Sequence, residues 1–512
     1  MYDTRFGQND LNDPVSDLRN EQSRYRFLPF RFIDLNGQRV VVNQVGEHEI
    51  LDRDTFDAFV KRRLSSATEA YQTLKAKHFL VDSNSPTPLT LLATKLRTKY
   101  SFLAGFTRLH IFVVTLRCDH SCHYCQVSRV SASKAQYDMS QASADKALDL
   151  VFRAPARAIK IEFQGGEPLL NFDLIRYVVD EAGQRNALRD ESGKKDIQFV
   201  VTTNLSFIDD TILAFMRDRN IFVSTSLDGP AVIHNANRPR PGNDAYERTI
   251  RGISLVREAL GHDAVSALMT TTRLSLEHPE AIVDEYARQG FDHIFLRPIS
   301  PYGFAVRTRE RTGYDRRAFL KFYERSLARI IEINRHGTPL VEVYAQILLT
   351  KILTPFATGY VDLQSPAGAG IGAVVYNYDG DVYASDEARM LAEMGDKSFK
   401  LGNLHQDSYE AIFGGSLLRS LVQNSIHDSL PGCADCAFNS YCGADPIENH
   451  ATQADIVGHR PTSDFCARNM GIIKHLLSLY HKGDEFVRDL FWAWVRGIPV
   501  QSVFPEVREN LA

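Results

Sequence analysis

Long apolar segments and an excess of charge of one sign are both missing from this 512-residue chain. It has no run of 18 apolar residues, so the sequence predicts no membrane-spanning helix. Residues 1–5 lack the apolar core of a signal peptide, and we therefore expect a cytoplasmic protein. Lysine and arginine number 59 against 63 acidic residues, a net charge of −4. This balance argues against a nucleic-acid or membrane surface and fits a globular protein of two or three domains.

Cysteine is also scarce, and its seven copies fall into two groups. The first group is Cys118, Cys122 and Cys125, which follow an apolar run at residues 109–116. Three thiolates on one short loop can ligate three irons of a 4Fe–4S cluster. The fourth iron then has no protein ligand, which is what a cluster needs in order to bind a substrate.

Short apolar runs alternate with amphipathic segments between residues 107 and 297. Alternation of this kind predicts βαβ units and a parallel sheet. Six units fit an incomplete (β/α) barrel with its chemistry at the carboxyl ends of the strands, and the first cysteine group follows the first strand. The predicted strands are 109–116, 158–163, 197–202, 221–226, 265–271 and 293–296, and the predicted helices are 141–152, 173–182, 209–217, 246–260 and 279–289.

A second motif, Gly165-Gly166-Glu167-Pro168, follows the second predicted strand. Paired glycines let the backbone approach a ligand closely, and Glu167 can accept hydrogen bonds from an ammonium group. The alternative is an ordinary turn between a strand and a helix.

The cysteine loop, with Tyr124 before its last cysteine, and the Gly-Gly-Glu-Pro motif together resemble the radical S-adenosylmethionine (SAM) superfamily. The resemblance implies an α/β fold with a partial (β/α)6 barrel, SAM, and a SAM-binding 4Fe–4S cluster on the three cysteines. It implies that Glu167 grips the amino group of SAM. The other cofactor-binding residues that it implies are Tyr124, Gly165, Gly166, Pro168, Thr203, Asn204, Ser226 and Asp228, with Arg297 lining the cavity. A surface turn is the alternative for Asp228 and the glycine after it.

The second cysteine group reads Cys433-x2-Cys436-x5-Cys442-x23-Cys466. In a reducing compartment such a set binds metal, and four thiolates can close a zinc site or ligate a cluster completely. The set resembles the second auxiliary cluster of the SPASM domain of peptide-modifying radical SAM enzymes. Cysteines of that domain's first auxiliary cluster are replaced here by Ser385 and Pro446. We therefore expect two clusters in this protein, not three.

Asp386 follows the serine that replaces a cluster cysteine. In the sulfatase maturases, which this region resembles, the aspartate at the matching position is the proposed base. The resemblance therefore implies that Asp386 is the proton acceptor. The alternative is a structural ion pair with Arg389 or a helix cap.

The region before the barrel forms a separate predicted unit. Asn36-Gly37 between apolar runs predicts a β-hairpin, and Asp52 is expected to cap a helix over 53–64, with a second helix over 68–77. The unit resembles the leader-recognition elements of enzymes that modify ribosomally made peptides, which bind a peptide as an added strand. A domain that only packs against the barrel is the alternative.

Six segments divide the whole chain. The two tryptophans, Trp492 and Trp494, are expected to close a core in the last one. The segments are 1–85, a small hairpin–helix domain; 86–106, a linker; 107–310, the partial barrel; 311–364, a helical bridge; 365–470, a SPASM-like auxiliary iron–sulfur domain; and 471–512, C-terminal helices.

Further blocks extend the resemblance over nearly the whole chain, toward the His-Xaa-Ser system radical SAM maturases. This family implies reductive cleavage of SAM to a 5′-deoxyadenosyl radical, which takes hydrogen from a ribosomally made peptide with His-x-Ser repeats. The partners it implies are that peptide, an external electron donor such as flavodoxin or ferredoxin, and a paired second radical SAM maturase. The blocks are 117–129, 161–171, 224–230, 234–239, 295–304 and 383–391.

A cluster closed by four thiolates suits electron transfer, which favours an oxidative modification or crosslink as the product. A peptide epimerase is less favoured because no thiol remains to donate hydrogen once all seven cysteines hold clusters. A protein oxidase like the anaerobic sulfatase maturases stays open. So does a different class, a non-catalytic iron–sulfur partner or electron carrier.

Overall fold

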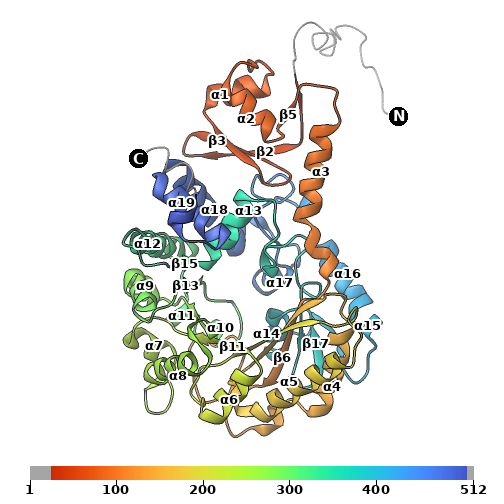
Figure 1. Cartoon of the computed structure of the whole chain (residues 1–512), viewed down its shortest axis with the longest axis vertical. Helices are drawn as coiled ribbons and strands as arrows, with labels where there is room; N and C mark the ends of the chain where they lie inside the picture. Colours follow the sequence, from red (N-terminus) through yellow and green to blue (C-terminus); the bar gives the residue numbers. More distant parts are fainter. Residues whose placement is uncertain (1–24, 504–512) are drawn as a thin grey trace, which may run out of the picture.

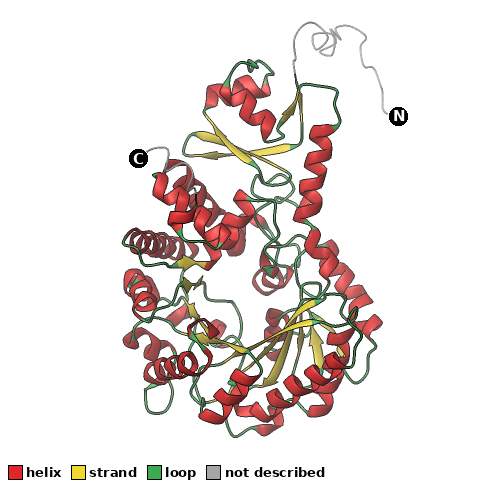
Figure 2. Cartoon of the chain, in the orientation of Figure 1, coloured by secondary structure: helices red, strands yellow, loops and turns green. Residues whose placement is uncertain are grey.

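A nine-stranded sheet organises the computed structural model, which describes residues 25–503 (Figures 1 and 2). Its strands lie in the order β14-β12-β11-β10-β9-β6-β16-β17-β18. Neighbours from β14 to β16 pair in parallel, and β16, β17 and β18 form an antiparallel meander. The parallel strands with their helices form the predicted α/β partial barrel. Its strands are β6 (Leu109–Thr115), β9 (Ala158–Gly165), β10 (Asp196–Thr202), β11 (Ile221–Ser226), β12 (Val265–Thr270) and β14 (Leu296–Arg297).

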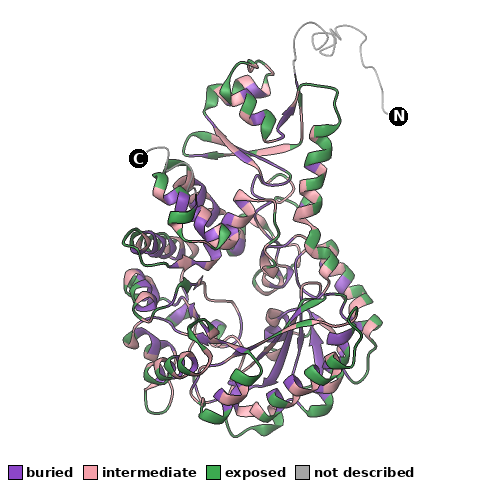
Figure 3. Cartoon of the chain, in the orientation of Figure 1, coloured by how far each residue is buried: buried purple, intermediate pink, exposed green. Residues whose placement is uncertain are grey.

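The helices between these strands begin at polar caps and bury one apolar face. Asp209, for example, accepts a hydrogen bond from the backbone N–H of Ile212 at 2.8 Å, so it caps its helix. In Figure 3 the barrel strands are buried and the outer helices are exposed on their solvent side. The five predicted helices are present as α4 (Gln141–Arg153), α5 (Phe172–Ala187), α6 (Asp210–Asp218), α8 (Ala245–Leu260) and α9 (Pro279–Arg288).

The sixth predicted strand, 293–296, is divided between two sheets. β13 (His293–Ile294) pairs with β15 (Val341–Glu342), whereas β14 pairs with β12 of the barrel. The single strand predicted there is therefore wrong in detail, because the chain changes partner at Phe295.

The C-terminal half returns to the barrel. β16 (Ala373–Tyr376) lies parallel to β6 and extends the sheet beyond its first strand. β17 (Asp381–Tyr383) and β18 (Lys400–Asn403) continue it antiparallel. The predicted SPASM-like segment thus contributes three strands to the barrel sheet, and its remaining helices are α14 (Asp386–Glu393), α15 (Tyr409–Gly414), α16 (Ser416–Gln423) and α17 (Pro446–Gln453).

A small unit lies at the opposite end of the molecule, at the top of Figure 1. It holds the predicted hairpin, with Asp52 capping α1 through a 2.7 Å bond from the Thr55 N–H. The segment expected to be a linker is largely helical. Pro86 and Pro88 stand at the start of helix α3, where proline is tolerated. The elements are β1 (Arg26–Phe27), β2 (Phe30–Leu35), β3 (Gln38–Asn43), β4 (His48–Leu51), α1 (Arg53–Val60), α2 (Glu69–Ala76), β5 (Leu80–Val81) and α3 (Thr87–Lys99).

Helices of the bridge and the C-terminal region pack together beside the barrel. Trp494 is buried among them, and Trp492 donates to the Tyr480 hydroxyl at 3.2 Å. No helix in residues 25–503 is long and apolar enough to cross a membrane. The remaining elements are β7 (Arg117–Cys118), β8 (Val130–Ser131), α7 (Ala231–Asn237), α10 (Phe304–Arg307), α11 (Arg309–Thr312), α12 (Arg316–Arg335), α13 (Val343–Leu353), α18 (Asp464–Lys482) and α19 (Glu485–Arg496).

Candidate active site

The three-cysteine loop leaves the carboxyl end of β6, where the barrel fold predicts the site. Its backbone is held from two other loops. The N–H of Ser121 donates to the Pro239 carbonyl at 2.7 Å, and that of Phe304 donates to the Cys125 carbonyl at 2.7 Å. These two bonds hold the backbone of the loop at both ends.

Burial raises the pKa of two of the loop thiols, Cys118 and Cys122. It raises the pKa of Cys122 to about 12, although the Arg238 guanidinium acts in the opposite direction. Burial also raises the pKa of Cys118, and Cys122 and Glu167 add to that effect. A bound metal cluster would supply the positive charge that converts these thiols to thiolates.

The paired glycines are required by the backbone of the first strand. Gly165 has φ +153°, and a Cβ there would lie 1.9 Å from the Thr115 carbonyl oxygen. A Cβ on Gly166 would lie 2.3 Å from the Arg117 carbonyl oxygen. Both glycines therefore let the second strand-end loop approach the cysteine loop, and the N–H of Glu167 donates to the Arg117 carbonyl at 2.7 Å.

Glu167 is fully buried beside the cysteine loop, and Pro168 behind it begins a short 3-10 helix. Its carboxylate accepts hydrogen bonds from the Thr203 hydroxyl at 2.7 Å and from the N–H groups of Asn204 and Leu169 at 2.8 and 3.0 Å. Burial raises the pKa of Glu167 to about 7, against the effect of those bonds. Three of about four lone-pair positions are used, which leaves acceptor capacity for a cationic ligand.

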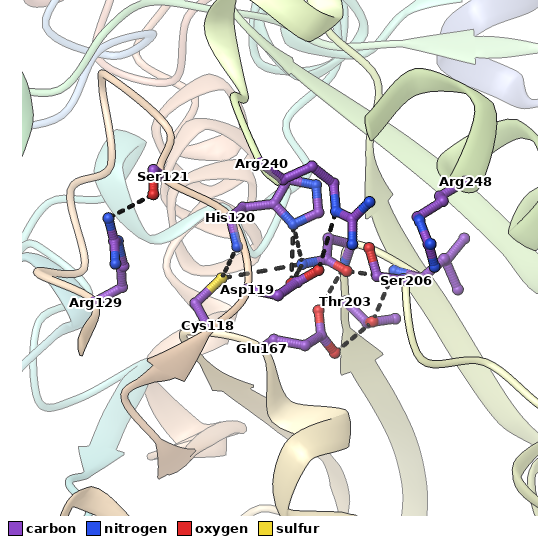
Figure 4. Close-up of polar contacts among 12 residues, drawn as sticks. Cys118, Asp119, His120, Ser121, Arg129, Glu167, Thr203, Ser206, Arg240 and Arg248 are labelled. Atoms are coloured by element: carbon purple, nitrogen blue, oxygen red, sulfur yellow. Dashed lines mark hydrogen bonds and ion pairs between the residues drawn. The ribbon is translucent and has the colours of Figure 1, made fainter. Parts of the chain in front are cut away.

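Figure 4 shows Glu167 and Thr203 near Cys118, Asp119 and His120. Asn204 connects the Glu167 carboxylate to the cysteine loop. Its amide nitrogen lies 2.9 Å from Asp119 Oδ1, 2.8 Å from His120 Nδ1 and 4.0 Å from Cys118 Sγ. Arg240 contacts Asp119 from the other side at 3.3 Å. The predicted residues Thr203 and Asn204 thus meet Glu167 and the first cysteine in one polar network.

Asp228 also lies under the loop, but its carboxylate already has protein partners. It accepts from the Tyr124 hydroxyl at 2.6 Å, from Arg238 Nε at 3.2 Å and from the Thr270 N–H at 3.3 Å. Arg238 also lies over the Tyr124 ring, 5.4 Å from its centroid. Within the described residues Asp228 and Tyr124 therefore support the cysteine loop, while Ser226 stands half-buried at the end of its strand.

Sequence reasoning missed Arg238, Arg240, Asp119 and His120. A signal existed for the two arginines, since both follow the fourth strand and its predicted Ser-Leu-Asp-Gly turn. Asp119 and His120 carried no comparable signal, because the spacing between Cys118 and Cys122 sets no residue type at the positions between them.

The four C-terminal cysteines converge on a second site. Burial raises the pKa of Cys442 to about 12, and Cys436, Cys466 and Cys433 raise it further. A tetrahedral zinc site with Zn–S bonds of about 2.3 Å would bring its sulfurs about 3.8 Å apart. In residues 25–503 no three cysteine sulfurs, of either group, lie within 4.8 Å of one another. Both sets are thus more widely spaced than the ligands of a single ion.

The small N-terminal unit braces this second site. The Arg31 guanidinium donates to the Ala434 carbonyl through Nε and bonds Asp428 at 2.8 Å. The Tyr441 hydroxyl donates to the Gly46 carbonyl at 2.6 Å. These bonds connect β2 and the β3–β4 turn to the loop that carries Cys433 and Cys436.

Asp386 forms an ion pair with Arg389, the alternative to its predicted role as a base. Its carboxylate bonds the fully buried Arg389 at 2.6 Å, and Ser385 caps the helix that both residues share. Its role as a base stays a prediction. Arg297, in contrast, lines a cavity together with Glu387, the neighbour of Asp386.

Residues 112–286 match the family model of the Radical SAM superfamily. The cysteine-type anaerobic sulfatase-maturating enzyme of Clostridium perfringens (strain 13 / Type A) is 22% identical over 342 residues, 64% of this chain and 84% of its own. Two other curated relatives are matched over 48% and 34% of their own lengths, so the chain spans half or less of those proteins.

Two solved structures share the fold. Native anSMEcpe with bound AdoMet and the Cp18Cys peptide aligns with a TM-score of 0.61 at 17% identity, over 73% of this chain and 98% of its own. Streptococcus suis SuiB bound to its precursor peptide SuiA aligns with a TM-score of 0.50 at 14% identity, over 86% of this chain and 99% of its own.

The fold and the match together define the class. Residues 112–286 are a domain similar to the Radical SAM superfamily, on the fold that the two solved structures share. The domain begins on β6 and includes the cysteine loop, Glu167 and Asp228.

Proposed function

We propose that this protein is a radical SAM peptide maturase that oxidises a ribosomally made peptide. The observation that carries the proposal is the three-cysteine loop at the barrel mouth, whose buried Cys118 shares one polar network with the buried Glu167 carboxylate. Similarity to a sulfatase-maturating enzyme, and to two folds solved with peptides bound, supports a polypeptide substrate.

In this proposal Cys118, Cys122 and Cys125 ligate the SAM-binding cluster, and Glu167 receives the amino group of SAM. Thr203 and Asn204 orient the Glu167 carboxylate, and an arriving ammonium would lower its pKa from about 7 and keep it ionised. Reductive cleavage of SAM to methionine and a 5′-deoxyadenosyl radical, which takes hydrogen from the substrate, is the chemistry that a 4Fe–4S cluster supplies at such a site.

The remaining predicted cofactor residues act around this pair. Gly165, Gly166 and Pro168 would bring the loop close to SAM. Ser226 and Asp228 would face the ribose and the carboxylate of SAM. Asp228 would do so while it accepts the hydrogen bond from the Tyr124 hydroxyl. Because Asp228 has three protein partners, we assign its main effect to the position of the cysteine loop.

The four C-terminal cysteines would hold one auxiliary 4Fe–4S cluster. Their spacing supports a cluster over a single zinc ion. Four thiolates leave no iron open, so electron transfer is the role that suits this site. An oxidised product follows from it: a crosslink or a dehydrogenated residue.

We also propose that the N-terminal unit binds the substrate's leader. In the described residues β2 pairs with β3 on one side only, so its other edge offers backbone groups for an added strand. The unit also packs against the second cysteine site, whereas the alternative placed it against the barrel; such packing is compatible with leader binding. Binding of a leader peptide to the full chain, abolished by proline at Arg31 or Ile33, would support this role.

The proposed substrate is a peptide with His-x-Ser repeats, and an external donor such as flavodoxin or ferredoxin would supply the electron. A paired second maturase is a further proposed partner. The test is mass spectrometry of such a peptide after anaerobic co-expression with the wild-type chain or the C118A variant.

A loss of two hydrogens that the C118A control lacks is the expected result. An unchanged peptide mass together with SAM cleavage would contradict this substrate and direct the search to sulfatase-type proteins. Exchange of one α-hydrogen for solvent deuterium without mass loss would instead identify an epimerase. Failure to cleave SAM would leave a non-catalytic iron–sulfur protein.

A further inference from the structure

A cavity lies between the barrel and the auxiliary region, and its wall is unusually acidic. Its lining includes Asp362 from the bridge, Glu387 from α14, and Asp445 and Glu448 from the start of α17. Burial raises the pKa of Asp362 to about 6 and those of Glu387 and Asp445 to about 7, because buried carboxylates are costly.

Two arginines face these carboxylates from opposite sides. Arg297 stands at the carboxyl end of β14, and Arg468 of α18 lies 3.7 Å from Glu448. Two cations against four carboxyl groups leave the cavity short of positive charge once the carboxyls ionise. The carboxylate of Glu387 makes no side-chain hydrogen bond in the part of the chain that the structure describes, unlike its paired neighbour Asp386.

A buried hydroxyl points to a missing ligand. Tyr302 lines the cavity and is 1% exposed, yet its hydroxyl has no hydrogen-bond partner among the described residues. Burial raises the pKa of Tyr302, and all four cavity carboxylates, Asp445 first, raise it further, so the hydroxyl faces the same space. An unpaired buried hydroxyl costs free energy unless a ligand or water completes it.

The wall also carries aromatic faces. Phe295 stacks on Tyr344 with 5.8 Å between ring centroids, and Tyr360 meets the edge of Tyr344 at 5.9 Å. All three rings line the cavity. Carboxylates combined with aromatic faces form a surface that attracts cations.

The cavity adjoins the proposed site of radical formation. Tyr302 is two residues before Phe304, whose N–H donates to the Cys125 carbonyl at 2.7 Å. Arg297 is joined to the neighbouring barrel strand, because the Thr271 N–H donates to its carbonyl at 2.8 Å. A group bound in the cavity is therefore held next to the cysteine loop.

We propose that this cavity binds a basic side chain of the substrate, with Glu387 as its principal counter-charge and Tyr302 as an added hydrogen-bond partner. The inference rests on the proposed function and extends it, since it names the chemical class that the site selects. The shared chemistry is a cationic nitrogen with N–H donors, which lysine, arginine or protonated histidine can each supply.

The test compares two probes that differ by one ammonium group. Acetyl-Gly-Lys-Gly-amide and its norleucine counterpart are titrated against the anaerobic full-length holoprotein with SAM, by ligand-observed NMR. We expect the lysine peptide to bind about tenfold more tightly, the size expected for a charged hydrogen bond. Histidine and arginine versions then show which base the cavity prefers.

Two near-isosteric variants locate the preference. E387Q should reduce it to about twofold or less, and Y302F should weaken lysine binding by a few fold, about the effect of one hydrogen bond. E247Q, an exposed glutamate on α8, is the matched control and should behave as wild type. Unchanged iron content and SAM binding in each variant would show that the fold is intact.

Equal affinity for the two peptides in wild type would overturn the proposal, and so would a lysine preference that survives E387Q. A lysine preference lost in E387Q, in a protein that never oxidises a peptide, would leave the cavity assignment standing and refute the proposed function. Peptide oxidation without any preference for a basic residue would refute the cavity assignment and leave the proposed function standing.

Discussion

The two cysteine sites are surrounded by different kinds of residue. Around Cys118 the neighbours are charged and polar side chains, with Glu167 keeping spare acceptor capacity. Around the C-terminal cysteines the Arg460 guanidinium lies beside Cys433, and Arg31 donates to the Ala434 carbonyl. The first site has three thiols and room for a ligand's charge, whereas the second has four thiols and is packed under another domain. This difference supports the proposal that the first site binds SAM.

The sharpest test of this comparison removes one thiol from each site. C118A should reduce SAM cleavage to background, because the SAM-binding cluster loses one of three ligands. C436A should retain SAM cleavage but lose peptide oxidation. Release of 5′-deoxyadenosine, measured with dithionite as reductant, separates the two.

Metal analysis of the same variants checks what each site holds. Wild type should bind about eight irons per chain, and C436A about four, if each site holds one cube. One zinc per chain in wild type, lost in C436A, would contradict an auxiliary cluster while leaving the first site unaffected. Full SAM cleavage by C118A would contradict the assignment of Cys118 to the SAM-binding cluster.

A second prediction concerns the carboxylate that distinguishes the first site. E167Q removes its charge and should weaken SAM binding by about 10- to 100-fold, the loss of one charge-assisted bond. Equilibrium dialysis with labelled SAM measures it. E162Q on the same strand is the control, since in residues 25–503 Glu162 accepts hydrogen bonds only from the Gln164 and Thr202 side chains. Equal affinity of E167Q and wild type would show that SAM does not use this carboxylate.

A third prediction concerns the cavity between the two sites. With pKa values of about 6 to 7, Asp362, Glu387 and Asp445 lose protons as the pH rises from about 6 to 8, while a lysine side chain stays charged. Affinity for the lysine peptide should therefore rise by up to about tenfold over this range, and that for the norleucine peptide should stay constant. Weaker lysine binding at the higher pH would contradict this sign.

The smallest expected effect tests the brace on the second site. R31A removes bonds to Ala434, Asp428 and Asn439 and should lower the free energy of unfolding by about 1–3 kcal/mol. Thermal unfolding of the holoprotein measures it, with iron at the auxiliary site expected to dissociate first. R39A, on the next strand of the same sheet, is the control. Identical unfolding of R31A and R39A would show that the Arg31 bonds to the auxiliary loop do not stabilise the protein.

Most of the barrel could be predicted because its strands are nearly continuous apolar runs between capped helices. The exceptions have specific causes. The run at 293–296 divides between two sheets, and apolar residues alone do not encode a change of partner. The segment 86–106, predicted as a linker, contains helix α3. Proline is common both in linkers and at the first positions of a helix, so Pro86 and Pro88 do not distinguish the two. Neither difference could be recognised from local pattern.

The sequence alone determined which residues could hold metal and at what spacing: the three-cysteine loop, the four-cysteine set, and the glycines before Glu167. Those properties are local, since spacing and residue type follow directly from chain order. Tertiary structure alone decided that Asp386 pairs with Arg389 while Glu387 faces an acidic cavity, and that Arg31 reaches a loop 403 residues away. Burial and charge depend on what the fold brings together, and neighbours in the chain can therefore receive opposite roles.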